Sequence, residues 1–290
     1  MTILNRTGER IDMEDQLRRL QLVELDMLRV LDRICRKYEL PYFVSWGTAL
    51  GAVRHQGFIP WDDDIDVCMF RKDFDRLKEV PEEEWEGLEL ALPGSKPFYH
   101  EKWYPKIFKP GTIFESEGWI HFVGQQEIRK PVWIDIFLFD YYDTEEEARR
   151  KTRKALIYHR MCYYSKYRTL INKGDPIQEK ALAVFKNLIH RVLKLFHTPE
   201  GYIEKYYQLV RKDHGKHIIC YDDLNSKEII DSRLDETDVF PLQDILFEDL
   251  KVMTAKDTDK ELRQLFGDYM QLPPEEERKG HVPHNLYLGE

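Results

Sequence analysis

The chain has 290 residues, which is enough for one large domain or two small ones. Its 42% hydrophobic and 13% aromatic content is typical of a globular protein, and its net charge of −9 argues against general nucleic-acid binding. No stretch approaches the roughly 18 apolar residues of a membrane span, and the N-terminus lacks the apolar segment of a signal peptide. We therefore expect a cytoplasmic protein.

The first half of the chain alternates helix and strand patterns. Apolar residues three and four apart predict an amphipathic helix over residues 13–38. Residues 42–46 and 65–70 read as strands, with a helical turn over residues 49–54 between them. The strongest strand signal of the chain is the apolar run at residues 132–138. These elements predict an α+β fold.

The second half differs in composition. Residues 144–212 read as largely helical, and a further helix is predicted over Asp259–Phe266. Residues 149–216 hold 17 Lys/Arg and 5 Asp/Glu, a balance of +12, whereas the rest of the chain has a balance of −21. We predict a core over residues 1–143 and a helical basic region with C-terminal elements over residues 144–290, which could form one continuous domain. The basic face could bind an anionic partner or could be a set of solvated helices.

Four acids lie within five residues, at Asp62, Asp63, Asp64 and Asp66. Carboxylates packed this closely repel one another, and a bound cation relieves the repulsion. On a strand, Asp64 and Asp66 would point to the same face. Because Mg²⁺ prefers oxygen ligands, we predict a Mg²⁺ or Mn²⁺ site here; the alternative is a solvated acidic loop.

Asp135 is a single acid inside the apolar strand VWIDIFLF. Burial of an unpaired carboxylate is costly, so it needs a cation. Placed beside Asp64 and Asp66 in the sheet, it would complete a three-carboxylate metal site; alternatively, it pairs with an arginine or caps a turn.

A Gly-Thr pair, Gly47 and Thr48, follows the first strand and opens a helical turn. Glycine allows close approach of a phosphate to the backbone, and amides at a helix start bind anions. Arg54 lies one to two turns later and can bind a phosphate with two hydrogen bonds. The order of these features predicts a phosphate site beside the acids.

The segment WGTALGAVRHQGFIPWDDDIDV at residues 46–67 resembles the LicD family of phosphotransferases, which have a nucleotidyltransferase-like fold. IDIF at residues 134–137 and LFGDYMQLPPEEERKGHVPH at residues 265–284 are similar to further segments of this family. The resemblance implies a mixed β-sheet flanked by helices. It also implies a cytosolic enzyme that transfers phosphocholine, or another CDP-linked group such as ribitol phosphate, to a sugar of a teichoic acid or lipopolysaccharide precursor.

The resemblance assigns metal binding and catalysis to Asp64, Asp66 and Asp135. It places Gly47, Thr48 and Arg54 around the donor phosphates. Lys106 lies at a position that is basic in similar proteins, so it is a candidate for a phosphate contact; the alternative is a surface lysine. We hypothesise that Asp135 helps to deprotonate or position the acceptor hydroxyl. Trp61 and Trp103 are candidates for an aromatic cage around a choline ammonium group, because they lie in polar segments.

The acceptor would be a glycan or a lipid-linked sugar. Residues 180–197 form a basic amphipathic helix pattern, which could contact the inner face of a membrane or pack on the core. Two other functions use the same acids. Asp62-x-Asp64 and Asp64-x-Asp66 fit the DxD pattern of metal-dependent glycosyltransferases, and a nucleotidyltransferase acting on a small molecule would share all three carboxylates. A non-catalytic binding module is a third alternative.

Overall fold

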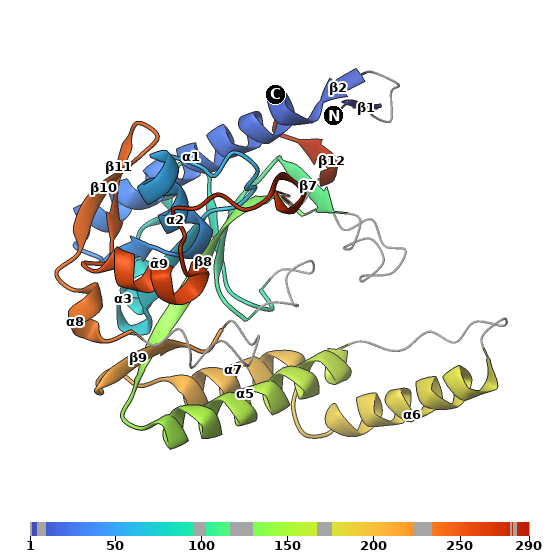
Figure 1. The fold of residues 1–290 in the computed structure, drawn as a ribbon. Helices are drawn as coiled ribbons and strands as arrows, with labels where there is room; N and C mark the ends of the chain where they lie inside the picture. Colours follow the sequence, from blue (N-terminus) through green and yellow to red (C-terminus); the bar gives the residue numbers. More distant parts are fainter. Residues whose placement is uncertain are drawn as a thin grey trace.

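The computed structural model describes residues 2–4, 10–95, 103–116, 130–166, 176–222, 234–278, 280 and 283–289. Within these residues, a mixed eight-stranded sheet has the order β10-β11-β3-β4-β8-β6-β5, and β9 pairs with β8 (Figure 1). Its strands are β3 (Tyr42–Val44), β4 (Asp66–Phe70), β5 (Glu89–Ala91), β6 (Lys106–Lys109), β8 (Val132–Tyr142), β9 (His217–Cys220), β10 (Gln243–Phe247) and β11 (Leu250–Thr254).

The centre of the sheet positions the predicted acids. Strand β4 runs parallel to β8, so that Asp66 is the register partner of Asp135. Strand β6 runs antiparallel to the other edge of β8, and there Lys106 is the partner of Asp135. Residues that face each other across neighbouring strands point to the same side of a sheet. The two acids and the lysine therefore form a row across three strands.

Helix α1 (Met13–Lys37) covers one face of the sheet. Its buried residues include Leu20, Met27 and Leu31, which pack in one hydrophobic cluster with Val67 of β4 and Ile136 of β8. Helix α2 (Trp46–His55) joins this cluster and connects β3 to the segment before β4. The spacing of the apolar residues explains the packing, because residues three and four apart lie on one side of a helix.

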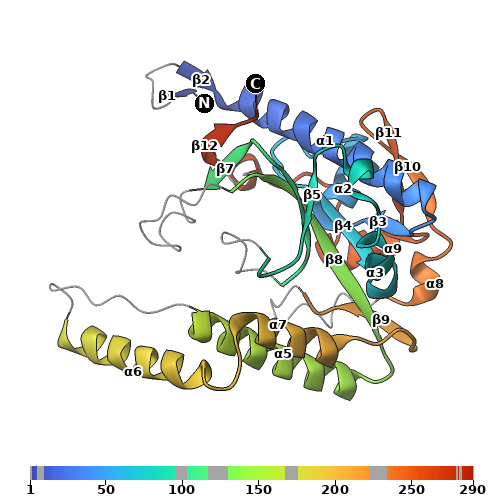
Figure 2. The same cartoon turned by 180° about the vertical axis from the view of Figure 1, so that it is seen from behind.

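The opposite face carries Cys68 and Phe70 of β4 and Phe137 and Phe139 of β8 in a second cluster. A separate layer of helices is visible in both views (Figures 1 and 2), and it packs on Tyr142 of β8 and Ile219 of β9, the residues next to those that face the second cluster. It consists of α5 (Glu145–Lys166), α6 (Ile177–Leu193) and α7 (Pro199–Val210). Helices α5 and α7 share a third hydrophobic cluster, and α6 packs only along part of α5 and extends past it.

The remaining elements are α3 (Arg71–Leu77), the 3₁₀ turns η1 (Glu82–Trp85) and η2 (Glu275–Glu277), α8 (Glu236–Val239) and α9 (Thr258–Phe266). Two small sheets pair β1 (Thr2–Leu4) with β2 (Arg10–Asp12), and β7 (Ile113–Ser116) with β12 (Pro283–Tyr287). All four cysteines are free and buried, as expected for reduced thiols. No helix in the described ranges is both long and apolar enough to cross a membrane.

A mixed α/β architecture with a mixed sheet and flanking helices is confirmed. The predicted helix over residues 13–38 is α1, the strand over residues 132–138 is the first part of β8, and the helical region over residues 144–212 forms α5, α6 and α7. The helical turn predicted over residues 49–54 begins earlier, at Trp46. The division at residue 143 stays a prediction; strands β9, β10 and β11 of the second region extend the sheet of the first.

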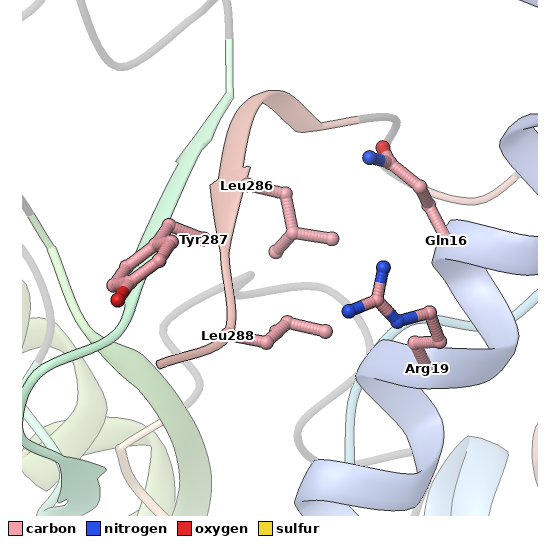
Figure 3. Close-up of a pocket in the computed structure, with 5 residues that line it drawn as sticks. All are labelled: Gln16, Arg19, Leu286, Tyr287 and Leu288. Atoms are coloured by element: carbon pink, nitrogen blue, oxygen red, sulfur yellow. The ribbon is translucent and has the colours of Figure 1, made fainter. Parts of the chain in front are cut away.

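One pocket of about 220 Å³ lies between α1 and the C-terminal strand β12. Gln16 and Arg19 of α1 face Leu286 and Leu288, whereas Tyr287 points to the other side of its strand (Figure 3). None of the predicted site residues lines this pocket.

Candidate active site

The row of Asp66, Asp135 and Lys106 is the centre of the candidate site. Asp135 and Lys106 are buried, with 6% and 2% of their surfaces exposed, and their charged groups form an ion pair. The Lys106 ammonium also lies over two aromatic rings, 4.5 Å from the centre of Trp133 and 5.1 Å from that of Tyr104. These rings shield the cation from water. The sequence predicted Lys106 as a phosphate contact, and its partner in the structure is Asp135.

The acidic loop Asp62–Asp64 leads directly into β4. Helix α1 holds this loop, because the Gln21 side chain donates a hydrogen bond of 2.9 Å to the carbonyl oxygen of Asp62. Asp63 is buried, and Asp64 and Asp66 are partly buried. The side-chain amide of Gln21 therefore fixes the backbone that carries the carboxylates, while the carboxylate charges remain close together.

The charges of this region are not balanced. Burial raises the pKa of Asp66 well above its ordinary value, and the carboxylates of Asp64 and Asp135 raise it further. The positive charge of Lys106 acts in the opposite direction but does not reverse the shift. The charge of Lys106 thus does not offset burial and the neighbouring acids at Asp66, and a bound cation would lower the pKa of Asp66.

Glu24 of α1 is an additional acid at this place. It is 3% exposed, and its Oε2 has no hydrogen-bond partner among the described residues. Burial raises the pKa of Glu24, and Asp64 is the nearby acid with the largest further contribution. A buried carboxylate oxygen without a partner is expensive, which makes Glu24 part of the same excess of acid.

The Gly-Thr pair starts α2 beside the acids. The Thr48 hydroxyl oxygen accepts a hydrogen bond of 2.8 Å from the Asp66 N–H and so fixes the start of β4. A Cβ atom at Gly47 would lie 2.7 Å from Oδ2 of Asp62, so glycine allows this carboxylate to approach the helix start. Trp46 has a φ of 45°, a conformation that is strained for a residue with a side chain. The strained turn and the glycine bring α2 and the acidic loop together.

Arg54 and Arg278 form a cationic group next to Trp61. Arg54 donates a hydrogen bond of 2.6 Å to the Tyr269 carbonyl oxygen and one of 3.0 Å to Nε2 of His55. The Arg278 guanidinium lies 5.4 Å from the centre of the Trp61 ring. Burial and the positive charge of Arg278 lower the pKa of Arg54.

This cationic group lies close to the acidic loop. Within the described chain, neither guanidinium forms an ion pair with a carboxylate. A Cβ atom at Gly280 would lie 2.2 Å from the Trp61 carbonyl oxygen and 3.0 Å from Oδ1 of Asp63, so the C-terminal segment packs against the loop. Two neighbouring arginines without acids are suited to bind an anion.

The two tryptophans of the predicted cage belong to different parts of the molecule. Trp61 packs at the edge of the first hydrophobic cluster, with its ring edge toward His55. Trp103 is 2% exposed and packs against Tyr206 of α7 at 4.7 Å in the third cluster. The expectation that Trp103 lies in a polar loop is wrong, because its ring joins the core between the sheet and the helical layer. A role of either ring in choline binding stays a prediction.

Among the described residues, no three His, Cys, Asp or Glu side chains are arranged to hold a metal ion. The three-carboxylate metal site of Asp64, Asp66 and Asp135 therefore also stays a prediction. The sheet register does bring Asp66 and Asp135 side by side, and the charge of Asp64 acts on both Asp66 and Glu24.

Comparisons with known proteins show a family domain within the chain. Residues 39–168 match the family model described as LicD/FKTN/FKRP, nucleotidyltransferase domain. The chain carries a LicD-family domain. The matched range contains the acidic loop, Asp66, Lys106 and Asp135, and it ends in the segment after α5.

The similarity to one LicD protein extends beyond that domain. The chain is 28% identical over 288 residues to the lipopolysaccharide cholinephosphotransferase LicD of Haemophilus influenzae, covering 94% of this chain and 98% of that protein. An uncharacterized protein of Rickettsia prowazekii is 37% identical over 54 residues, 19% of this chain and 20% of that protein. A Rickettsia typhi protein is 35% identical over a segment of the same length. The predicted family and enzyme class, a LicD-like phosphotransferase, are confirmed.

Three residues of the site were not predicted from the sequence. Glu24 could have been found, because it is an acid four residues after Leu20 on the apolar stripe of α1. Arg278 lies in a segment that resembles the LicD family, but its distance along the chain gives no sign of its contact with Trp61. Glu261 of α9 accepts hydrogen bonds from the Ser45 hydroxyl and the Trp46 N–H at the start of α2, and no local pattern indicates this.

Proposed function

We propose that this protein transfers phosphocholine from CDP-choline to a sugar hydroxyl of a cell-surface glycan precursor and releases CMP. The observation that carries the proposal is the similarity over nearly the whole length of both chains to a lipopolysaccharide cholinephosphotransferase. A shared domain alone would support only a common fold. Here the similarity covers 94% of this chain and 98% of that protein, which is far more than the matched domain of residues 39–168.

The proposed fold of the catalytic core is nucleotidyltransferase-like. Three features of the sheet support it: an acid-x-acid segment at the start of β4, a third acid on the neighbouring strand β8, and a Gly-Thr pair at the start of α2. The DxD glycosyltransferase and the small-molecule nucleotidyltransferase are not favoured, because neither activity is that of the similar full-length protein.

We propose that Asp64, Asp66 and Asp135 hold Mg²⁺ or Mn²⁺. Carboxylate oxygens are the ligands that these ions prefer, and the raised pKa of Asp66 together with the unpartnered Oε2 of Glu24 indicates a deficit of positive charge. When bound, the metal would neutralise charge on the phosphates and on the departing CMP. The donor chemistry of the residues present therefore fits such an ion.

The protein's own cations would bind the diphosphate of the donor. Arg54 and Arg278 are close to the acidic loop and have no carboxylate partners within the described chain, so their charges are available for an anion. Lys106 lies at the other side, against Asp135. We propose that these three groups and the backbone at Gly47 and Thr48 orient the donor.

The proposed reaction is a displacement at phosphorus. The acceptor oxygen forms a bond to the phosphorus that carries choline, and the bond from that phosphorus to the bridging oxygen breaks. The bridging oxygen leaves with CMP. Asp135 is the proposed group that positions the acceptor hydroxyl or accepts its proton.

The choline group requires a different environment from the phosphates. A quaternary ammonium binds to faces of aromatic rings. Trp61 is the better candidate of the two predicted tryptophans, because it is partly exposed, whereas Trp103 is enclosed by the core.

The first experiment compares possible donors. The purified protein is incubated with Mg²⁺ and, separately, CDP-choline, CDP-ribitol, CDP-glycerol, UDP-glucose, CTP and ATP, and thermal stability and CMP release are followed. We expect stabilisation and slow CMP release with CDP-choline, and loss of both in the Asp64→Ala/Asp66→Ala variant. Stabilisation by UDP-glucose or ATP, with no response to any CDP-alcohol, would contradict the proposal and favour one of the two alternatives.

A further inference from the structure

Helix α6 turns its apolar residues away from the protein. Ile177, Val184, Phe185, Leu188 and Val192 are all exposed, with exposed fractions from 43% to 84%. Their spacing of 7, 8, 11 and 15 residues from Ile177 places them on one side of the helix. Leu195 and Phe196, in the turn that follows, are 83% and 69% exposed and extend the surface. We call these seven residues the α6 apolar face.

The contact of α6 with α5 fixes this orientation. The buried residues of α6 are Ala183 and His190, seven residues apart and on the side of the helix opposite the apolar face. Nδ1 of His190 lies 3.0 Å from the carbonyl oxygen of Tyr164 in α5. Ala183, the polar contact of His190 and the packing of Leu193 at the end of the helix therefore attach α6 to the molecule.

An exposed ridge of this kind is unusual, because a surface helix of a globular protein normally turns its apolar stripe inward. Helix α1 does so with Leu20, Met27 and Leu31. Large exposed apolar patches mark a surface that binds a partner or a membrane. The α6 apolar face lies on the part of the molecule that extends past α5 (Figures 1 and 2).

The charges around the face select its partner. Lys180 and Arg191 flank it on one side, and Glu179 is the sole acid of α6, on the side of its buried residues. Residues 149–216 have a balance of +12, and the rest of the chain has a balance of −21. A second copy of this chain would bring like charges together, whereas an anionic surface would attract this region and repel the body.

We propose that the α6 apolar face docks the protein onto a lipid bilayer that carries anionic headgroups. The helix would lie in the plane of the interface, with Phe185 and Leu188 among the acyl chains and Lys180 and Arg191 at the headgroups. The acidic body with the candidate active site would face away from the lipid. This inference does not depend on the proposed reaction, because it rests only on α6 and the charge distribution.

The test is binding of the full chain to vesicles. Mixed phosphatidylcholine and phosphatidylglycerol vesicles are compared with pure phosphatidylcholine vesicles, at low and high salt, by co-sedimentation. We expect binding to the anionic vesicles that weakens with salt. The affinity of the Phe185→Ser/Leu188→Ser variant for these vesicles should fall by about tenfold or more, because the variant loses two of the large apolar side chains of the face.

The control variant is Leu22→Ser/Leu246→Ser, which changes two leucines of similar exposure, 43% and 44%, on the body of the protein. Its vesicle binding should equal that of the wild type. The charge variant Lys180→Glu/Arg191→Glu should lose the preference for anionic vesicles, whereas Lys251→Glu/Lys256→Glu on the body should keep it. Circular dichroism checks that each variant is folded.

Three outcomes would overturn the proposal. The first is vesicle binding that is equal in the wild type and the Phe185→Ser/Leu188→Ser variant. The second is the absence of vesicle binding together with a dimer, measured by light scattering, that this variant dissociates; the face would then bind a second copy. The third is the absence of both binding and dimerisation.

Discussion

Strand β8 carries two buried aspartates in contrasting surroundings. Asp140 is fully buried and accepts three hydrogen bonds from the Arg71 guanidinium, of 2.7, 2.9 and 3.0 Å. Asp135, five residues earlier and on the opposite face of the strand, pairs with Lys106 but lies beside Asp66. At Asp140 the carboxylate is held by two nitrogens of one guanidinium, whereas Asp135 lies beside the carboxylate of Asp66 on the neighbouring strand.

The difference separates a structural ion pair from a candidate binding site. Arg71 also lies 3.7 Å from Asp222, whose carboxylate accepts hydrogen bonds from the Tyr206 hydroxyl and the Leu138 N–H. This network joins β8, α3 and α7 with its polar groups paired. Burial raises the pKa of Asp222 to about 6, but its carboxylate is hydrogen-bonded. In the other cluster, Oε2 of Glu24 has no partner within the described chain, and burial and neighbouring acids raise the pKa of Asp66. A native protein retains such an imbalance where a ligand completes the site.

Removal of one partner from the balanced pair should have the largest effect. We expect Asp140→Asn to lower the free energy of unfolding by about 3–5 kcal/mol, because the buried Arg71 charge loses its counterion. Chemical denaturation of the wild type and the variant measures this difference. The double variant Arg71→Met/Asp140→Leu should recover part of the loss. If Asp140→Asn is as stable as the wild type, the pair does not hold the fold.

The same change in the unbalanced cluster should affect activity instead. We expect Asp66→Asn to lower kcat/KM for CDP-choline roughly 100- to 1,000-fold, because the carboxylate acts directly on the reacting groups. Its thermal midpoint should stay equal to that of the wild type or rise, since the substitution removes a repelled charge. The exposed Asp259→Asn serves as the activity control. A large fall in stability with intact specific activity would assign Asp66 a structural role.

Sequence patterns predicted the positions of these acids but not their partners. Two strand patterns predicted an acid at a definite place on each strand, because strand periodicity determines which side chains share a face. That the two strands are neighbours was a hypothesis, which the register of β4 and β8 confirms. The ion pair of Lys106 with Asp135 and that of Arg71 with Asp140 depend on the order of strands in the sheet. That order is set by packing of the whole chain, which a local pattern does not contain.

The same limit explains the other differences. Trp103 has polar neighbours in the sequence, yet its ring is buried against α7, which lies about 100 positions later in the chain. For α6, the sequence left both membrane contact and core packing open, because an apolar stripe is needed in both cases. The contact of His190 with α5 and the exposure of Phe185 and Leu188 show that the stripe faces outward.

Addition of metal should sharpen the contrast between the two clusters. We expect Mg²⁺ in excess over its Kd to stabilise the wild type by about 2 kcal/mol, and to have no effect on Asp66→Asn. The variant Lys106→Met should be less stable without metal and gain more from Mg²⁺, because it leaves a larger excess of acid. Thermal midpoints with Mg²⁺ and with EDTA measure these gains. Equal gains in the wild type and Asp66→Asn would place the ion elsewhere.

Glu261 is intermediate between the two clusters. It accepts hydrogen bonds from the Ser45 hydroxyl and the Trp46 N–H, but it forms no ion pair with a cation of the described residues. Burial raises its pKa from 4.5 to about 7. A carboxyl group with a raised pKa in the folded state gives its full stability below pH 4.5, and that stability is lost as the pH rises through about 7. Relative to Glu261→Gln, the wild type should therefore lose about 2 kcal/mol over this range.

Denaturation of both proteins at several pH values measures that difference. Glu261→Gln keeps an acceptor for Ser45 and the Trp46 N–H, so its own stability should vary less between these pH values. A difference between wild type and variant that is the same at pH 4.5 and at pH 7 would show that Glu261 does not titrate in this range.

The arginine pair is the cationic counterpart of the unbalanced acids, and it should make the smallest contribution. We expect Arg278→Gln to raise the KM for CDP-choline about tenfold with a smaller change in kcat, because a contact to the donor phosphates exists both before and during the reaction. Arg263→Gln, which removes an exposed arginine paired with Asp259, is the control and should leave KM unchanged.

If Arg278→Gln leaves KM unchanged, the arginine pair does not bind the donor. An equal loss of kcat and of thermal stability would indicate that Arg278 holds the C-terminal segment on Trp61. A rise confined to KM would instead support contact of the arginine pair with the donor phosphates, on the positive side of a site whose other side is acidic.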